Sequence, residues 1–230
     1  MSKLFSGTEG ALEINTADIA DDAVTAAKIS DAVTLGGGME SMQVFTSSGT
    51  WTKPSGITKV KVTVVGGGGG GGGEVNNVSA GGGAGGGTAV KFIDVSSISS
   101  ETVTIGAGGA DSTTADGAAG GTSSFGSHCS ATGGGGGQAT ENPDVSAVGG
   151  AGSGGDFNIQ GEGGHYSSWN SGAHFLGMGG ASTHGFGGVG SYQTAAWDGK
   201  GYGGGGSGRH QSNAAGGNGT DGIVIVEEFK

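Results

Sequence analysis

Glycine constrains this chain more than any other feature, because 60 of its 230 residues are Gly and many lie in runs such as 66–73 and 133–137. Gly loses more conformational freedom on folding than any other residue, and it has no side chain to bury. With only 2 Pro and no regular Gly spacing, the chain cannot form a collagen triple helix. Such a composition is typical of disorder. An ordered fold would need dense backbone hydrogen bonding to offset the lost entropy.

Strand patterns on both sides of the Gly runs favour a folded domain. Residues 59–64 alternate strictly, which places Val60, Val62 and Val64 on one face of a strand. Residues 223–226 are apolar on both faces, which predicts a strand in the middle of a sheet. Further strands are predicted within 39–52, over 88–95 and over 101–105, with a turn at 53–56. A last strand that pairs with early ones would bring the ends of the Gly-rich stretch together.

The Gly runs themselves predict a bundle of polyglycine II helices. Such a helix has three residues per turn and no internal hydrogen bonds, so its N–H groups are free to bond sideways to neighbouring helices. The absence of side chains lets backbones approach closely and adds weak Cα–H···O contacts. We therefore expect a mainly β fold with little α-helix: a small, sandwich-like antiparallel β frame that carries a polyglycine II bundle with long surface loops. The frame is expected over 39–105 and 219–230, and the bundle with its loops over 106–218.

Residues 1–38 differ in composition from this glycine-rich domain, 39–230. They are acid-rich, and Asp18–Thr25 is echoed by Lys28–Thr34. Their apolar residues are too small and too few to form a core within one chain. The segment could wrap with copies of itself, dock on a partner, or form a floppy terminus. Residues 36–38, all Gly, are typical of a hinge.

Charge and hydropathy exclude several functions. The net charge is -11 and the 9 Lys and Arg residues are scattered singly, so no basic stripe could bind nucleic acid. No apolar run approaches the ~20 residues that a membrane span needs, which predicts no membrane insertion. The first residues lack the apolar core of a signal peptide. We therefore expect a protein made in the cytoplasm and released by lysis or within a virion.

The sequence offers no catalytic, metal or cofactor site. Ser182 lacks the closing Gly of a nucleophile elbow, and no phosphate-binding G-x-x-x-x-G-K-[ST] motif is present. None of the five His residues is expected to form a metal-ligand pair with a Cys or carboxylate. Nothing sets the separation of Asp156 and Glu162 that a glycosidase would require. Cys129, the single Cys, is expected to pack as a small buried residue. We therefore expect no enzyme.

Three parts of the chain resemble phage tail-fibre proteins. Residues 51–56 and 60–73, closing on 219–225, resemble the glycine-rich domain at the ends of phage tail fibres. The alternation of Gly runs and loops is similar to the tail-fibre-tip adhesins of T-even-like phages, in which polyglycine helices form a sandwich and the loops bind host receptors. The loops lie at 138–147, 156–160, 165–175, 191–198 and 209–213. The repeat over 18–34 is similar to segments near the start of tail-fibre proteins, which are usually trimeric.

This resemblance implies a non-catalytic adhesin in the virion, on a tail fibre or another surface appendage. Its partners would be a bacterial outer-surface protein or glycan and, through residues 1–38, another virion fibre or tail protein in a homotrimer. Tyr and Trp within polar loops offer large contact area at low entropy cost. The expected receptor-binding residues are Tyr166, Trp169, Asn170, Tyr192 and Trp197.

Two other aromatic residues and two other functions complete the expectations. Phe186 and Tyr202, flanked by Gly on both sides, are expected to plug the ends of the bundle. One alternative function is a structural head-fibre or decoration protein without a specific receptor. The other is a glycine-rich antifreeze protein, which would need a flat face of regularly spaced small residues.

Overall fold

The computed structural model describes residues 38–73, 80–139, 146–170, 173–175, 177–192, 196–210 and 215–230. These residues form one unit, Gly38–Lys230, and the expectations for 1–37 lie outside the described residues. Within this part of the chain the regular secondary structure is entirely β, with no helix. The prediction of a mainly β, largely antiparallel fold is confirmed.

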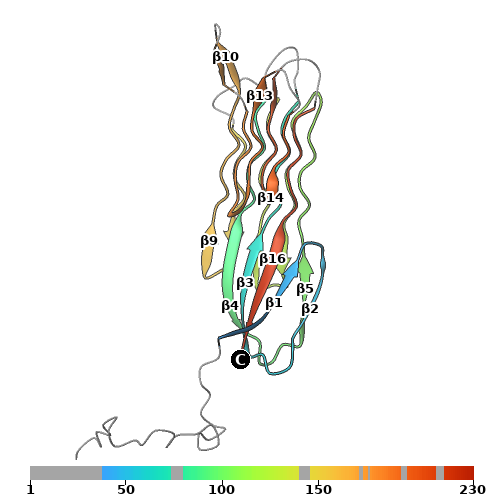
Figure 1. The fold of residues 1–230 in the computed structure, drawn as a ribbon, viewed down its shortest axis with the longest axis vertical. Coiled ribbons are helices and arrows are strands. Elements are labelled where there is room, and N and C mark those ends of the chain that lie inside the picture. The colour runs from blue at the N-terminus through green and yellow to red at the C-terminus, as the bar shows by residue number, and fades with distance from the viewer. Residues whose placement is uncertain are drawn as a thin grey trace, which may run out of the picture. The chain divides into compact units, whose positions relative to one another are not determined.

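The frame consists of two five-stranded sheets (Figure 1). Sheet A has the order β1 (Met39–Phe45), β16 (Ile223–Phe229), β3 (Lys59–Val65), β4 (Thr88–Asp94) and β9 (Phe157–Ile159). Sheet B has the order β2 (Gly49–Thr52), β5 (Ser100–Thr104), β6 (Ser123–Phe125), β7 (Cys129–Ala131) and β8 (Gly152–Ser153). Each of the strands predicted over 59–64, 88–95, 101–105 and 223–226 is present. The last of them, β16, lies between β1 and β3 as predicted.

The hydrophobic core lies between these two sheets. Strand alternation directs Val60, Val62 and Val64 of β3 inward, and all three are fully buried. Sheet B contributes Trp51 and Phe125, whose ring centroids lie 5.6 Å apart. The residues of this core all lie in or beside the two sheets, so the core does not extend into the Gly-rich part of the domain.

A buried carboxylate ties the two sheets together at one end of this core. Glu228 follows Val224 and Val226 on the inward face of β16 and is fully buried. Its Oε1 accepts a 2.8 Å hydrogen bond from Trp51 Nε1 and a 2.7 Å bond from Gln43 Nε2. Ser41 Oγ donates to its Oε2. These donors offset the cost of burying the charge, and they fix β1 and β2 against β16.

Beyond the frame, residues 66–73 donate hydrogen bonds to three neighbouring segments in strict rotation. Gly66, Gly69 and Gly72 donate to segment 81–87, at 2.8–3.0 Å. Gly67, Gly70 and Gly73 donate to 115–121. Gly68 and Gly71 donate to 217–220. A β-strand would give a period of two, whereas a period of three is the one that a polyglycine II helix would have.

Three such segments lie at the centre of the bundle and contact each other: 66–73, 80–87 and 203–209. Their described residues are buried. Each is hydrogen-bonded to six neighbouring segments, which is the coordination of a rod in hexagonal packing. Hexagonal packing around a triangle of rods places nine rods in the next shell. In the described part of the chain that shell is formed by 106–113, 115–121, 132–138, 147–151, 161–165, 177–181, 187–190, 196–199 and 215–222.

The bundle therefore includes two segments, 66–73 and 80–87, that were expected to belong to the β frame. The reason is connectivity. Strand β3 runs directly into 66–73, and 80–87 runs directly into β4, so one continuous stretch of chain serves both the sheet and the bundle. The end of β3 and the start of β4 thus determine where these two central segments meet the frame.

Backbone contact explains why these segments consist almost entirely of Gly. A Cβ added at Gly82 would overlap the carbonyl oxygen of Met178 in the adjoining segment. At Gly81, one residue earlier, the nearest atom to an added Cβ is the His165 carbonyl oxygen at 3.5 Å, an ordinary contact distance. Fully buried Ala80 and Ala84 occupy two other positions of the same segment. A methyl group is therefore excluded at some positions of the segment, such as Gly82, and accommodated at others, such as Gly81.

We predict opposite effects for two neighbouring substitutions in this segment. Gly82→Ala should lower the free energy of unfolding by about 1–3 kcal/mol or more, because its methyl group meets fixed backbone. Gly81→Ala is the matched control and should leave stability unchanged or raise it by about 0.4–1 kcal/mol, since it restricts the unfolded chain. Thermal melts followed by circular dichroism measure both. Equal melting temperatures for the two variants would show that this segment is a loop.

Candidate functional site

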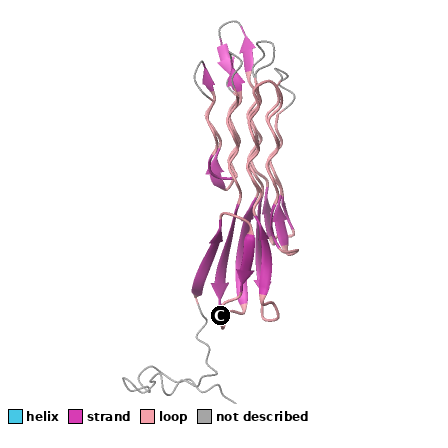
Figure 2. Cartoon of the chain, turned by 90° about the vertical axis from the view of Figure 1, so that its right-hand side faces the viewer, coloured by secondary structure: helices cyan, strands magenta, loops and turns pink. Residues whose placement is uncertain are grey.

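The chain reverses direction after each segment, so successive turns alternate between the frame and the opposite end of the bundle, here called the distal end (Figure 2). Four of the turns at the distal end fall within the predicted loops 138–147, 165–175, 191–198 and 209–213, and another, at 113–115, was not predicted. Parts of these loops, including 140–145 and 193–195, lie outside the described residues. The predicted loop 156–160 is different, because it contains β9 and forms the edge of sheet A.

The backbone of all five predicted contact residues lies at or near the distal end. Trp169 and Asn170 belong to β10 (Ser168–Asn170), which forms an antiparallel pair with β11 (Ala173–Phe175). Tyr192 belongs to β13 (Ser191–Tyr192), which lies parallel to β15 (Arg209–His210). The side chains of these three residues lie outside the described part. Tyr166 and Trp197 are described, and both are exposed.

Trp197 combines a fixed backbone with an exposed side chain. Its N–H donates a 2.8 Å hydrogen bond to Ser207 Oγ, and its carbonyl accepts a 2.9 Å bond from the Ser207 N–H. Ser207 is fully buried in the central segment 203–209. The Trp197 side chain is nevertheless 53% exposed. An aromatic residue held in this way can contact a partner with little loss of backbone entropy.

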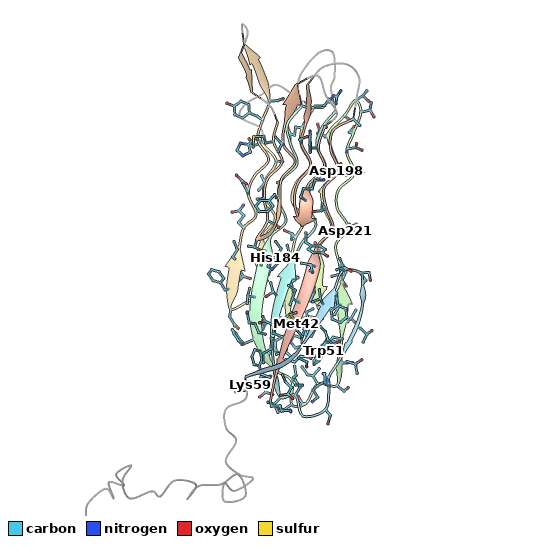
Figure 3. The ribbon with its side chains drawn as sticks, in the orientation of Figure 1. Met42, Trp51, Lys59, His184, Asp198 and Asp221 are labelled. Carbon is cyan, nitrogen blue, oxygen red and sulfur yellow. The ribbon has the colours of Figure 1, made fainter. Side chains whose placement is uncertain are left out.

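Acidic and amide side chains complete the backbone hydrogen bonds at the outer surface of the bundle (Figure 3). Asp221 Oδ1 accepts the Gly108 N–H at 2.7 Å, and Asp198 Oδ1 accepts the Asn218 N–H at 2.7 Å. Each carboxylate takes the place of a carbonyl that a further segment would have supplied. Many of the acids in this chain therefore close the lattice at its edges.

The two carboxylates considered as a glycosidase pair have the same structural role. Glu162 Oε2 accepts the Ala181 N–H at 3.0 Å. Asp156 Oδ2 accepts the Phe92 N–H at 2.8 Å, in the frame. The two side chains thus serve different parts of the domain, one in the bundle and one beside sheet A.

The expectation that Phe186 plugs the end of the bundle is wrong, because its side chain is 77% exposed. Phe186 lies in β12 (His184–Phe186), which pairs with β14 (Lys200–Tyr202) beside the frame, far from the distal end. Tyr202 is half-buried in the same strand pair. The physical reason is that the chain turns at β12 on the outside of the bundle, which leaves the Phe186 ring in solvent.

The same packing reveals exposed residues that the sequence analysis missed. Val148, Met178 and Val189 are single apolar residues within Gly-rich segments, and all three are exposed. A Gly segment that is packed on its inner side can accommodate a side chain only on its outer side. A lone apolar residue in a Gly run is therefore a signal for an outward position, and Met178 lies in a segment next to the one that leads to Tyr166.

The ionisable side chains of the described residues do not gather into a metal centre. No group of three or more His, Cys, Asp and Glu side chains in this part could hold a metal ion. Cys129 is a buried free thiol, as expected, and burial raises its pKa to about 11. The neighbouring His128 Nε2 pairs instead with Glu101 Oε1 at 3.2 Å. None of the described segments forms a helix long and apolar enough to span a bilayer.

The fold defines a class of protein in which a β sandwich extends into a bundle of backbone-paired Gly segments. A comparison with protein families finds a match to a glycine-rich domain over residues 43–228. This match covers most of the chain, so the chain belongs to the glycine-rich domain family. A comparison with curated proteins finds no match.

The position of Cys129 leads to a prediction about its reactivity. Alkylation requires the thiolate, and with a pKa of about 11 only about one thiol in a thousand is ionised at pH 8. We expect native Cys129 to react with iodoacetamide at pH 8 at least a hundredfold more slowly than in the denatured chain, whose thiol has a pKa near 8.5. Mass spectrometry of timed samples measures both rates. Comparable rates would show an accessible, ionised thiol.

Proposed function

We propose that this chain is a phage tail-fibre-tip adhesin that recognises a bacterial surface protein or glycan through its distal end, without catalysis. The observation that carries the proposal is the alternating chain direction. It gathers four loops at one end of the bundle, two of which, 165–175 and 191–198, carry Tyr and Trp among polar residues. Both described termini of the domain lie at the other end. A receptor at the distal end would therefore meet loops only.

The bundle supports this function by holding its loops on a rigid base. We infer that its segments are polyglycine II helices, because their hydrogen bonds repeat every three residues and no Gly in 66–73 or 80–87 has a positive φ. Each loop begins and ends on a segment whose backbone groups are paired. Loop sequences could thus change to suit different receptors while the lattice stays the same, which is the logic of antibody loops on a fixed sandwich.

We further propose that residues 1–38 attach the domain to another virion fibre or tail protein and contribute to a homotrimer. Their acid-rich composition and internal repeat support this role, together with the Gly hinge at 36–38. We predict that deletion of residues 1–36 leaves a folded domain that is monomeric or more weakly associated. Light scattering gives the mass, and an unchanged trimer after the deletion would contradict this role.

The receptor-binding proposal predicts which substitutions separate binding from stability. Trp169→Ala and Trp197→Ala should each weaken binding to host cells by about thirtyfold, since anchoring aromatics typically contribute 2 kcal/mol or more. The melting temperature should change little. Phe186→Ala is the control, because this exposed aromatic lies beside the frame and its loss should leave binding, corrected for valence, intact.

Two outcomes of this experiment would contradict the proposal. Buried aromatics cost about 3 kcal/mol or more on truncation. If both Trp variants lose that much stability while binding per folded molecule is unchanged, the rings are structural. If the purified wild-type chain neither binds host cells nor competes with virions, the alternative of a head-fibre or decoration protein without a receptor is favoured.

A second candidate function, ice binding, is supported by one specific observation. The outward residues of sheet B alternate with the core and are all Thr or Ser: Thr50, Thr52, Ser100, Thr102, Thr104, Ser124 and Ser130. They form a face of small residues at strand spacing, which is one of the features that an antifreeze protein would need. The exposed aromatics of the distal end have no role in that function. Measurement of thermal hysteresis decides between the two, since an adhesin should produce none.

A further inference from the structure

The outer face of sheet A is unusually apolar for a surface that faces water. Strand register places Met42 and Val44 of β1 outward, next to Ile225 of β16. Toward the other edge of the sheet, on the same outer face, lie Val90 and Phe92 of β4 and then Phe157 of β9. Phe92 and Phe157 are 63% and 62% exposed. Antiparallel sheets that cover a core on one face normally carry polar residues on the other.

The opposite face of the same sandwich follows this rule, which makes the contrast informative. Sheet B presents only Thr and Ser outward, as at Thr50 and Thr102, which lie directly opposite each other. Both sheets cover the same core and have the same number of strands. The apolar face of sheet A is therefore not a general consequence of the fold. Exposed apolar patches of this kind mark interaction surfaces.

The outer face of sheet A carries a groove as well as exposed aromatic rings. A groove of about 400 Å³ lies on it, between Met42 and Ile225 of the sheet and His184 of β12. Just before β12, Thr183 is fixed to the sheet by a 2.7 Å hydrogen bond between its hydroxyl and that of Thr88. Phe186 follows His184 by two residues and so points to the same side of β12. A face that carries both a groove and exposed rings can be complementary to itself, as an interface between identical copies requires.

Charges on this face are balanced within it. Lys61 Nζ pairs with Glu227 Oε2 at 2.7 Å, and Lys59 lies directly opposite Asp94. The whole chain has a net charge of -11, so two copies repel each other at long range. Contact through a neutral face would limit that repulsion. Because the face has no excess charge, it offers no electrostatic attraction to a strongly charged partner.

We propose that the outer face of sheet A is a contact surface between copies of this chain. Strand spacings of about 4.8 Å and rises of about 3.4 Å per residue give the face a projected area of roughly 500 Å². The adjoining β12–β14 strand pair, which carries Phe186, adds to this area, and a stable interface uses ~800 Å² per partner. The partner is a second copy, and the contact does not use the distal loops.

Charge substitutions on the two outer faces test this proposal in the full-length chain. Met42→Lys combined with Phe92→Glu places one charge of each sign on the face of sheet A, opposite Glu227 and Lys61. The control, Thr50→Lys combined with Thr102→Glu, places the same two charges on the face of sheet B. Net charge is unchanged in both. Sedimentation velocity over a hundredfold concentration range gives the dissociation constant for self-association, and thermal melts check folding.

We expect the sheet A variant to raise the dissociation constant at least tenfold, while the sheet B control matches the wild type. Equal self-association of all three proteins would overturn the proposal. A wild-type chain that is monomeric throughout the concentration range would also overturn it and would assign the face to a different partner. Binding of the sheet A variant to host cells, corrected for valence, should remain. The test is therefore independent of the proposed receptor function.

Discussion

Backbone hydrogen bonds between Gly segments hold the distal part of this domain together, where the described residues form no hydrophobic core. Each N–H of 66–73 finds a carbonyl in one of three neighbouring segments, and six of its carbonyls accept in return. This density depends on the absence of Cβ atoms, because an added methyl at most positions would overlap backbone of the next segment. Burial of paired amides thus replaces burial of side chains. The small β sandwich closes one end and connects its strands directly to the central segments.

This constraint separates the parts of the chain that can vary from the parts that cannot. Gly positions such as Gly82 face fixed backbone, so they tolerate almost no change. Carboxylates such as Asp221 complete the lattice at its surface and have a structural reason to be present. Exposed side chains of the described distal residues, such as Tyr166 and Trp197, are under neither demand. Residues at the distal end, including Trp197, are held on a rigid base and are available to serve a binding function.

Features with a two-residue period could be predicted from the sequence, and features that depend on connectivity could not. Strict alternation over 59–64 and apolar character on both faces over 223–226 fixed β3 and the central place of β16. Identical Gly runs carry no information about which one is central, so 66–73 was assigned to the frame. Loop composition indicated which stretches leave the Gly segments, whereas two- and three-residue strands such as β12 gave no local signal. Phe186 was misplaced for that reason.

Hydrogen exchange of backbone amides tests the Gly lattice most directly. Nuclear magnetic resonance of the labelled chain can follow the amides of 66–73, 80–87 and 203–209 individually. If these segments are central and fully hydrogen-bonded, their amides should exchange as slowly as those of β3 and β16, by opening of the whole domain. Exchange at the rates of an unstructured peptide, with β3 still protected, would contradict the account, because the Gly segments would then be loops on a small sandwich.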